Sequence, residues 1–177
     1  MKNNLQLTNL SEFLRASHIK RWGIVQTAVP QSVAEHQYRV FLMVRMLGRE
    51  IGFSPEDQKH AEDLALLHDL PEIRTGDAPT PHKSPEVKRI LKEVEREVFP
   101  EAIEAEEACS KEARELVKFC DTAESILFLE VNGLGQHSKE VKNLLTFQMV
   151  ERLDRSSIHP EDKATLLEHF QKCLAET

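Results

Sequence analysis

A histidine and an aspartate, His68 and Asp69, stand side by side where an apolar helical run ends in the segment LLHDLPEIRTGD. Two further acids, Glu72 and Asp77, follow within the same segment. Imidazole and carboxylate groups together suit divalent transition metals such as Mn, Fe, Co, Ni or Zn, whereas an all-oxygen shell suits Mg or Ca. The segment therefore indicates part of a metal site whose remaining ligands must come from elsewhere in the chain.

Two other predicted helices supply candidate ligands. A second histidine, His36, lies on the inward face of an earlier helix. In the helix expected from Ser110, an apolar stripe that ends at Val131 is interrupted by Asp121 and Glu124, which should both face the core. A buried carboxylate pays a large desolvation cost unless it is neutralised or paired with a cation or metal.

The economical arrangement places two imidazoles and two carboxylates around one divalent ion. These candidate ligands are His36, His68, Asp69 and Asp121. In the alternative, each histidine is an ordinary core or surface residue, and Asp121 pairs with Arg39 or another cation. We favour the metal site, because three separate helices each place a ligand-type residue on an apolar face.

The elements that must position these residues are helices, since helix signals cover almost the whole chain without convincing strand alternation. Ser32 opens a capping-box pattern with Glu35, and Ser54 precedes a proline at the first helical position. Further helices are expected from Ser84, from Ser110, and over 138–153 and 159–174. The sequence predicts an all-α fold, a bundle of six or more helices.

Length favours one domain that spans residues 1–177, since a chain of 177 residues can bury a sizeable single core. The acidic stretch 100–110 is the nearest feature to a linker, but it is short and compatible with a helix. No internal repeat or low-complexity tract divides the chain.

Charge and composition limit the classes of partner that the protein can bind. A formal net charge of −7 disfavours binding to nucleic acid polymers or anionic membranes, which relies on clustered Lys and Arg. A small anionic substrate remains compatible, because a metal or one or two arginines supply local positive charge. Without a long apolar segment, we expect no membrane span and a cytoplasmic location. The three cysteines lack CxxC spacing, which argues against a disulfide framework or a thiolate zinc site.

Three segments, AEHQYRV, LLHDLPE and FCDTAESI, resemble the H…HD…D signature of the HD-domain metal-dependent phosphohydrolases. More narrowly, RW at 21–22, SVAEHQYRV at 32–40 and HDLPEIRTGDAPTP at 68–81 are similar to the bacterial 5′-deoxynucleotidases, which dephosphorylate deoxynucleoside 5′-monophosphates. The resemblance implies a helical HD domain. It also implies metal ligation by His36, His68, Asp69 and Asp121, and functional roles for Arg21, Trp22, Glu72 and Asp77.

The chemistry of phosphomonoester hydrolysis fits these roles, because it needs charge neutralisation, an activated water and a protonated leaving oxygen. The metal would polarise a phosphoryl oxygen and activate the water, while Arg21 would clamp the other phosphoryl oxygens. Glu72, one helical turn from His68 and Asp69, would act as general acid or orient the water. Alternatively, Arg21 is a solvated basic residue and Glu72 an acid at a helix start.

Trp22 and Asp77 are expected to bind the nucleoside. The resemblance places Asp77 beside the sugar or the catalytic water. It places Trp22 near the deoxyribose, where the bulk of the indole excludes a 2′-hydroxyl. The alternatives are that Asp77 bonds only its own turn and that Trp22 fills the core.

The sequence thus predicts a 5′-deoxynucleotidase that uses one divalent ion per site (Co, Mn, Zn, Fe or Ni) and releases deoxynucleoside and phosphate. A second hypothesis keeps the metal site but gives it another phosphoester, such as a ribonucleotide, cyclic nucleotide or alarmone. A third is a non-catalytic, metal-stabilised helical scaffold, although a structural site would need neither Arg21 nor Glu72. We also expect a homodimer that pairs through an exposed helix face.

Overall fold

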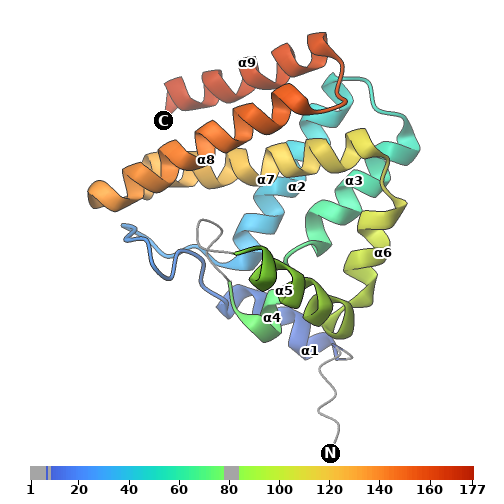
Figure 1. Cartoon of the computed structure of the whole chain (residues 1–177), viewed down its shortest axis with the longest axis vertical. Helices are drawn as coiled ribbons and strands as arrows, with labels where there is room; N and C mark the ends of the chain where they lie inside the picture. Colours follow the sequence, from blue (N-terminus) through green and yellow to red (C-terminus); the bar gives the residue numbers. More distant parts are fainter. Residues whose placement is uncertain (1–6, 8, 78–83) are drawn as a thin grey trace, which may run out of the picture.

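Helices form most of the described chain in the computed structural model, which covers residues 7, 9–77 and 84–177 (Figure 1). They are α1 (Leu10–Phe13), the 3₁₀ helix η1 (Leu14–His18), α2 (Val33–Glu50), α3 (Pro55–Leu67), α4 (Glu72–Thr75), α5 (Pro85–Val98), α6 (Pro100–Ala108), α7 (Lys111–Asn132), α8 (Gly135–Arg155) and α9 (Pro160–Glu176). Within these residues the only β pairing is two isolated bridges, so the all-α prediction is confirmed. Residues 78–81 of the segment HDLPEIRTGDAPTP lie outside the described residues.

Serine caps start the main helices where the sequence predicted them. The Ser32 hydroxyl accepts a hydrogen bond from the Glu35 amide at 3.2 Å, and the Glu35 carboxylate accepts one from the Ser32 amide at 2.7 Å. The Ser54 and Ser110 hydroxyls accept in the same way from backbone amides at the starts of α3 and α7. Each such cap contributes about 1 kcal/mol by satisfying an amide that has no partner within the helix.

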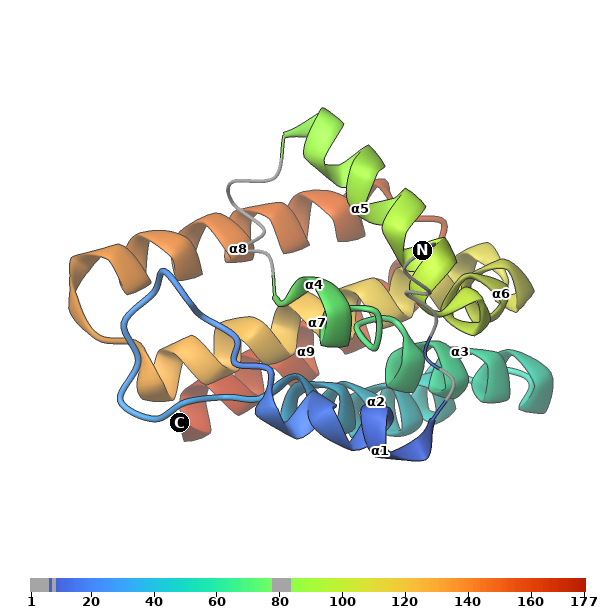
Figure 2. The same cartoon turned by 90° about the horizontal axis from the view of Figure 1, so that it is seen from below.

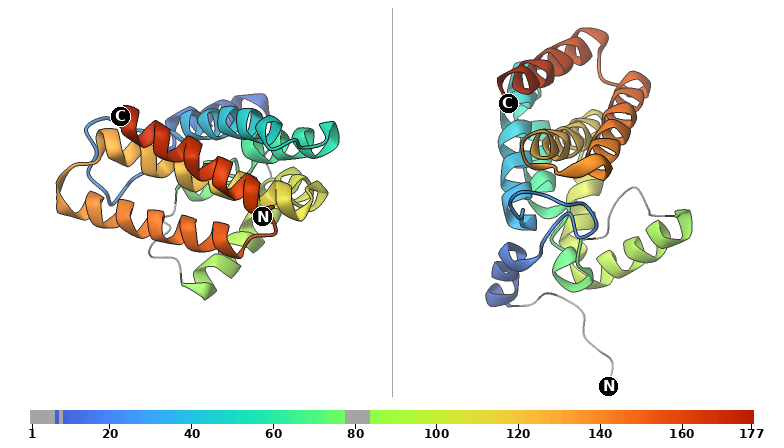
Figure 3. Two further views of the ribbon diagram at one scale, coloured as in Figure 1. Left: turned by 90° about the horizontal axis from the view of Figure 1, so that it is seen from above. Right: turned by 90° about the vertical axis from the view of Figure 1, so that its left-hand side faces the viewer.

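Helix α7 is the centre of the bundle and packs against α2, α3 and α8. Figure 3 shows α7 between α2 on one side and α8 on the other. The core contains fully buried apolar side chains from these helices, among them Val44, Ala61 and Leu116. Burying a side chain the size of leucine contributes about 1.5–3 kcal/mol, so this packing fixes how α2, α3 and α7 lie against one another.

The segment between η1 and α2 runs along the surface to the junction of α7 and α8 (Figure 2). Two backbone hydrogen bonds hold it there, from the Ala28 amide to the Asn132 carbonyl at 2.7 Å and from the Leu134 amide to the Gln26 carbonyl at 2.9 Å. This segment carries Arg21, so its attachment brings a basic side chain from the N-terminal part of the chain to the central helix.

One local prediction was wrong. Val131 is 61% exposed rather than core-facing, and the last turns of α7 instead bury Phe128 and Leu129. A single apolar stripe does not predict which residues of α7 are buried, because helices α2, α3, α8 and α9 pack on several sides of it. The acidic stretch 100–110 was expected to be compatible with a helix, and its first part forms α6 (Pro100–Ala108), which packs on α3 and α5. No helix in the described ranges has the length and apolar character needed to cross a membrane.

Candidate metal centre

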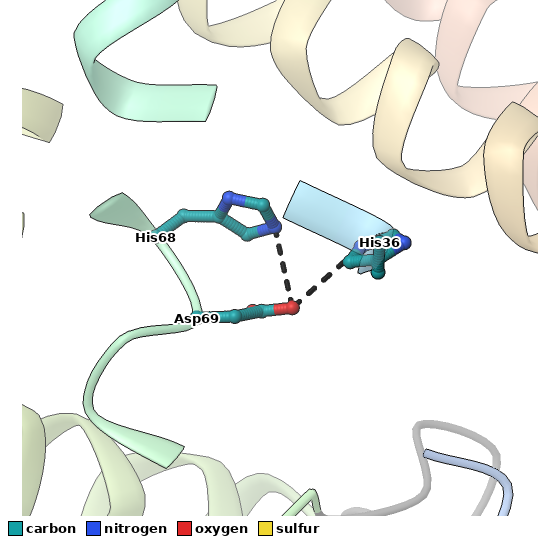
Figure 4. A group of neighbouring side chains, drawn as sticks. All are labelled: His36, His68 and Asp69. Carbon is teal, nitrogen blue, oxygen red and sulfur yellow. Dashed lines mark ion pairs between the residues drawn. The ribbon is translucent and has the colours of Figure 1, made fainter. Parts of the chain in front are cut away.

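Imidazole and carboxylate groups from three parts of the chain meet at one place. His36 lies on α2, His68 caps the end of α3 and Asp69 follows it. Donor atoms of these three residues lie within 4.8 Å of one another, and Figure 4 shows both rings turned toward the Asp69 carboxylate. On α7, the Asp121 Oδ1 lies 3.1 Å from the His36 Nε2. The structure therefore brings three of the predicted ligands within reach of one ion, and the fourth, Asp121, lies against His36.

The His68 ring is oriented as a metal-binding histidine would be. Its Nδ1 lies 3.0 Å from the Ala65 carbonyl, which can only accept, so Nδ1 carries the proton and donates. The neutral ring then has a lone pair on Nε2, which is buried, 3.4 Å from the Asp69 Oδ2, and without a hydrogen-bond partner among the described residues. A lone pair facing a carboxylate is repulsive, and a divalent cation between them removes that repulsion. The donor set therefore fits a divalent transition metal.

A buried carboxylate orients the second histidine. Glu124 Oε2 lies 2.6 Å from the His36 Nδ1, which leaves Nε2 facing Asp121 and Asp69. The Gln31 side-chain amide donates to the other Glu124 oxygen at 2.7 Å. A carboxylate that holds the far nitrogen of a ligand histidine fixes the tautomer and raises its basicity. The sequence predicted that Glu124 faces the core but assigned it no function.

Replacing Glu124 by glutamine should weaken metal affinity by roughly 10- to 100-fold, because the amide carries no charge to hold the His36 ring. A competition titration against a chelating dye measures this affinity. Glu130→Gln is the matched control, since Glu130 lies on the same helix but is exposed and paired with Lys142. Equal affinities in wild type, Glu124→Gln and the control would contradict the positioning role.

The cluster keeps its carboxylates ionised. Burial alone would raise the pKa of Asp69, but His68, His36 and Arg21 together lower it. Burial likewise opposes ionisation of Asp121, yet Lys118 and His36 hold its pKa well below the usual range. For His36, burial and Arg21 lower the pKa, but hydrogen bonds to Asp121 and Glu124 raise it overall. An incoming metal therefore finds charged carboxylates and competes with a proton on His36.

The alternative interpretation gave Asp121 a partner in Arg39 or another cation, and the structure places another cation there. Arg39 does not pair with Asp121; its Nη1 lies 3.4 Å from the Glu124 Oε1. The cation beside Asp121 is Lys118, one turn earlier on α7, with its Nζ 2.6 Å from Oδ2. This pair uses one carboxylate oxygen and leaves Oδ1 directed at His36, so it is compatible with metal ligation.

Arg21 lies directly beside the cluster. Its Nη1 is 3.4 Å from the Asp69 Oδ2, and its Nη2 donates to the Ser125 hydroxyl at 3.0 Å. Burial lowers the pKa of the guanidinium, but Asp69, Asp121 and other acids outweigh it and raise the pKa overall. Arg21 is thus a permanently charged donor in the site and not the solvated surface residue of the alternative interpretation.

Trp22 adopts a strained backbone next to Arg21. Its φ of 65° is uncommon outside glycine, and it is the one positive φ at a non-glycine residue in the described chain. The Trp22 amide donates to the Asp77 carboxylate at 3.2 Å, and its indole N–H donates to the Gln31 side-chain oxygen at 2.8 Å. The ring stacks on Phe128 at 5.9 Å between centroids. These contacts hold the indole in place. Asp77 accepts a hydrogen bond from Trp22, a residue far away in the sequence, so it does not bond only within its own turn.

One pocket joins these residues to the metal cluster. Its walls include Arg21, Trp22, Asp77 and the candidate ligand Asp121. Glu72 starts α4, where its amide donates to the Asp69 carbonyl at 3.0 Å, so the chain places this acid one turn from the ligand pair. The sequence missed Gln31, Lys118 and Ser125. Only Gln31 comes from a distant segment, whereas Lys118 and Ser125 lie one turn before and after Asp121 on α7, where helical spacing could have indicated them.

Comparison with known proteins decides the family. The family described as the HD domain matches residues 14–128. The chain belongs to the HD domain family. It is 51% identical over 173 residues to a dATP triphosphohydrolase of Cyanophage S-2L, a match that covers 98% of this chain and 99% of that protein. This HD-domain protein is also 32% identical over 127 residues to a 5′-deoxynucleotidase of Enterobacter sp. (strain 638), which covers 60% of this chain and 63% of that protein.

Solved structures agree with the family. The Cyanophage S-2L HD phosphohydrolase DatZ, bound to dA and one catalytic Zn²⁺ ion, superposes with a TM-score of 0.95 at 50% identity, covering 97% of this chain and 99% of that one. An HD-domain phosphohydrolase from Listeria innocua superposes at 0.69 with 15% identity, over 94% and 88% of the two chains, which shows the fold alone. This HD-domain protein is a metal-dependent phosphohydrolase, so the scaffold hypothesis is wrong.

Proposed function

We propose that this HD phosphohydrolase hydrolyses dATP to deoxyadenosine and inorganic triphosphate. One similarity supports a triphosphate substrate, because the dATP triphosphohydrolase matches nearly the whole chain at 51% identity. The dA held in the superposed DatZ structure supports deoxyadenosine as the product. The sequence predicted a deoxynucleoside monophosphate instead, and the more distant 5′-deoxynucleotidases favour that second candidate. Both reactions break the bond between O5′ and the α phosphorus, so the same reactive centre serves either substrate.

The observation that carries the proposal is that the candidate ligand Asp121, the buried Arg21 and the indole of Trp22 line one pocket, and that Asp121 and Arg21 also contact the cluster of His36, His68 and Asp69. In our proposal two imidazoles and two carboxylates hold one ion: His36, His68, Asp69 and Asp121. When bound, a divalent ion supplies Lewis acidity that polarises a phosphoryl oxygen and activates water. We propose zinc as this ion, because it suits nitrogen and oxygen ligands and is the ion named in the DatZ structure.

The residues around the cluster take the other catalytic roles. Arg21 donates to oxygens of the α phosphoryl group and stabilises the charge that builds up in the transition state. Glu72 protonates the departing O5′ or orients the attacking water. The net change adds the hydroxyl of water to phosphorus and its proton to O5′.

Trp22 and Asp77 are proposed to select deoxynucleosides. The indole is held by its stack on Phe128 and its hydrogen bond to Gln31, so it cannot move aside at low cost. A rigid wall beside C2′ excludes an added hydroxyl more effectively than a flexible one does. Asp77 supports this wall through the Trp22 amide and presents its carboxylate to the same pocket.

A substrate panel tests the proposal. The protein is stripped with a chelator, resupplied with Zn²⁺, Co²⁺ or Mn²⁺, and assayed with dATP, dADP, dAMP and ATP. We expect the highest kcat/KM for dATP, with triphosphate and deoxyadenosine formed in equal amounts, and a value for ATP lower by about 10²-fold or more. A higher kcat/KM for dAMP than for dATP would favour the 5′-deoxynucleotidase candidate, and equal rates on dATP and ATP would remove the role of Trp22 in sugar selection.

We further propose that the chain forms one HD domain over residues 1–177 and pairs as a homodimer. Large apolar side chains lie exposed along one face of α2, with exposed fractions of 58% for Tyr38, 44% for Leu42 and 52% for Met46. Covering such a face stabilises association. Sedimentation equilibrium should give twice the chain mass, and a monomer mass at micromolar concentration would contradict pairing. A cytoplasmic location stays a prediction.

A further inference from the structure

Helix α8 lines the substrate pocket with two kinds of side chain. Val141, Leu145 and Arg152 all contribute to its wall. Val141 and Leu145 are buried and apolar, whereas Arg152 is exposed and charged. The rise from Val141 to Arg152 is about 16 Å along the helix axis. The pocket therefore has an apolar end beside the indole of Trp22 and a cationic end further along α8.

The cationic end extends beyond the metal cluster. Arg152 lines the same pocket as Lys118 and Asp121. Asp121 raises the pKa of Lys118 and the positive charge of Arg152 lowers it, which indicates that Arg152 lies near Lys118. A second cavity of about 290 Å³ continues from here and is lined again by Lys118 and Arg152. Its two carboxylates are both engaged elsewhere, Glu151 with Arg155 and Glu115 with Lys111. Positive charge thus continues along the wall past the position expected for the α phosphoryl group.

Arg152 has no structural partner that accounts for its placement. Among the described residues, no carboxylate forms an ion pair with its guanidinium and no hydrogen bond of its side chain is found. The next arginine on α8, Arg155, is by contrast held by Glu151 at 2.8 Å. An arginine that lines a substrate pocket beside another cation, without an ion pair of its own, is suited to an anionic ligand.

We infer that Arg152, with Lys118 beside it, binds the β and γ phosphates of a nucleoside triphosphate. This inference rests on the proposed function, because it concerns the part of dATP that dAMP lacks. The metal cluster and Arg21 already neutralise the α phosphoryl group, so the additional negative charge of a triphosphate needs further cations. The planar guanidinium can bind two phosphate oxygens at once. Arg152 is therefore a specificity residue for the length of the phosphate chain, while the bond that breaks is unchanged.

The test uses the zinc-loaded full chain and the variant Arg152→Gln. Lys139→Gln is the matched control, because Lys139 is an exposed cation on the same helix and the substitution removes the same charge. Calorimetry measures binding of inorganic triphosphate, orthophosphate and deoxyadenosine. We expect Arg152→Gln to weaken triphosphate binding by roughly 10- to 100-fold, as for the loss of a charged hydrogen bond. Binding of deoxyadenosine, and all binding by the control, should be unchanged.

Kinetics separate this inference from the proposed function. Arg152→Gln should raise the KM for dATP by a similar factor and leave the kinetics of dAMP unchanged. If wild type does not hydrolyse dATP while Arg152→Gln still loses triphosphate affinity, the proposed function fails and the anion site stands. If wild type hydrolyses dATP and Arg152→Gln binds triphosphate as tightly as wild type, only the role of Arg152 is overturned. An equal loss of deoxyadenosine binding would also overturn it.

Discussion

Replacing Asp69 by alanine is expected to lower kcat/KM for dATP by a factor on the order of 10³ or more, even with excess Zn²⁺. One Asp69 oxygen lies 3.4 Å from the His68 Nε2, 3.6 Å from the His36 Nε2 and 3.4 Å from the Arg21 guanidinium. The substitution therefore removes a proposed metal ligand and the carboxylate nearest to Arg21. Steady-state kinetics with saturating metal measures the effect.

The control for this variant is Asp63→Ala, since Asp63 is an exposed aspartate on α3 close in sequence to the ligand pair. It should retain wild-type kinetics. Thermal unfolding in the presence of chelator shows whether Asp69→Ala remains folded, which separates loss of the site from loss of the fold. A folded Asp69→Ala variant that keeps its activity would contradict the assignment of Asp69.

Replacing Glu72 by glutamine is expected to lower kcat by about 10²–10⁴-fold, the range found for general acid–base groups. The amide keeps the size of the side chain but cannot transfer the proton that the departing O5′ needs. Metal content should be unchanged, because Glu72 is not among the proposed ligands. Glu56→Gln is the matched control, since Glu56 is an exposed glutamate on the neighbouring helix α3 and should be dispensable.

An aryl phosphate distinguishes the two roles proposed for Glu72. Aryl oxides leave readily without a proton, so a variant that lacks only the general acid should lose much less activity on this substrate than on dATP. A residue that orients water should matter equally for both. Full activity of Glu72→Gln on both substrates would exclude either role.

Local sequence signals predicted the helices, because helix starts and inward faces depend on short-range order, and the inward faces in turn indicated the candidate ligands. Serine caps are satisfied by amides three residues away, so Ser32 and Ser54 mark helix starts without knowledge of the fold. His36 and Asp121 could be assigned to inner faces because helical spacing fixes the face. Once α2, α3 and α7 were expected to pack together, inward polar groups on each had to meet.

The contacts that sequence reasoning missed depend on the register between helices. Glu124 was expected to be buried, but its bond to the His36 ring requires the relative position of α2 and α7, which no local pattern encodes. The same holds for Gln31, which reaches Glu124 from a loop. The sequence also did not predict the number of phosphates in the substrate, because the same metal-ligand motif would act on the O5′–phosphorus bond of a monophosphate or a triphosphate. Arg152 lies beyond that motif, on a helix whose role in the pocket appears only in the folded chain.

The measurement that tests the account most directly is anomalous diffraction at the zinc edge from crystals of the zinc-loaded protein. We expect one strong peak per chain, coordinated by the side chains of His36, His68, Asp69 and Asp121. A peak at another set of side chains, or no peak within this cluster while the protein hydrolyses its substrate, would contradict the proposal that these two imidazoles and two carboxylates hold the catalytic ion.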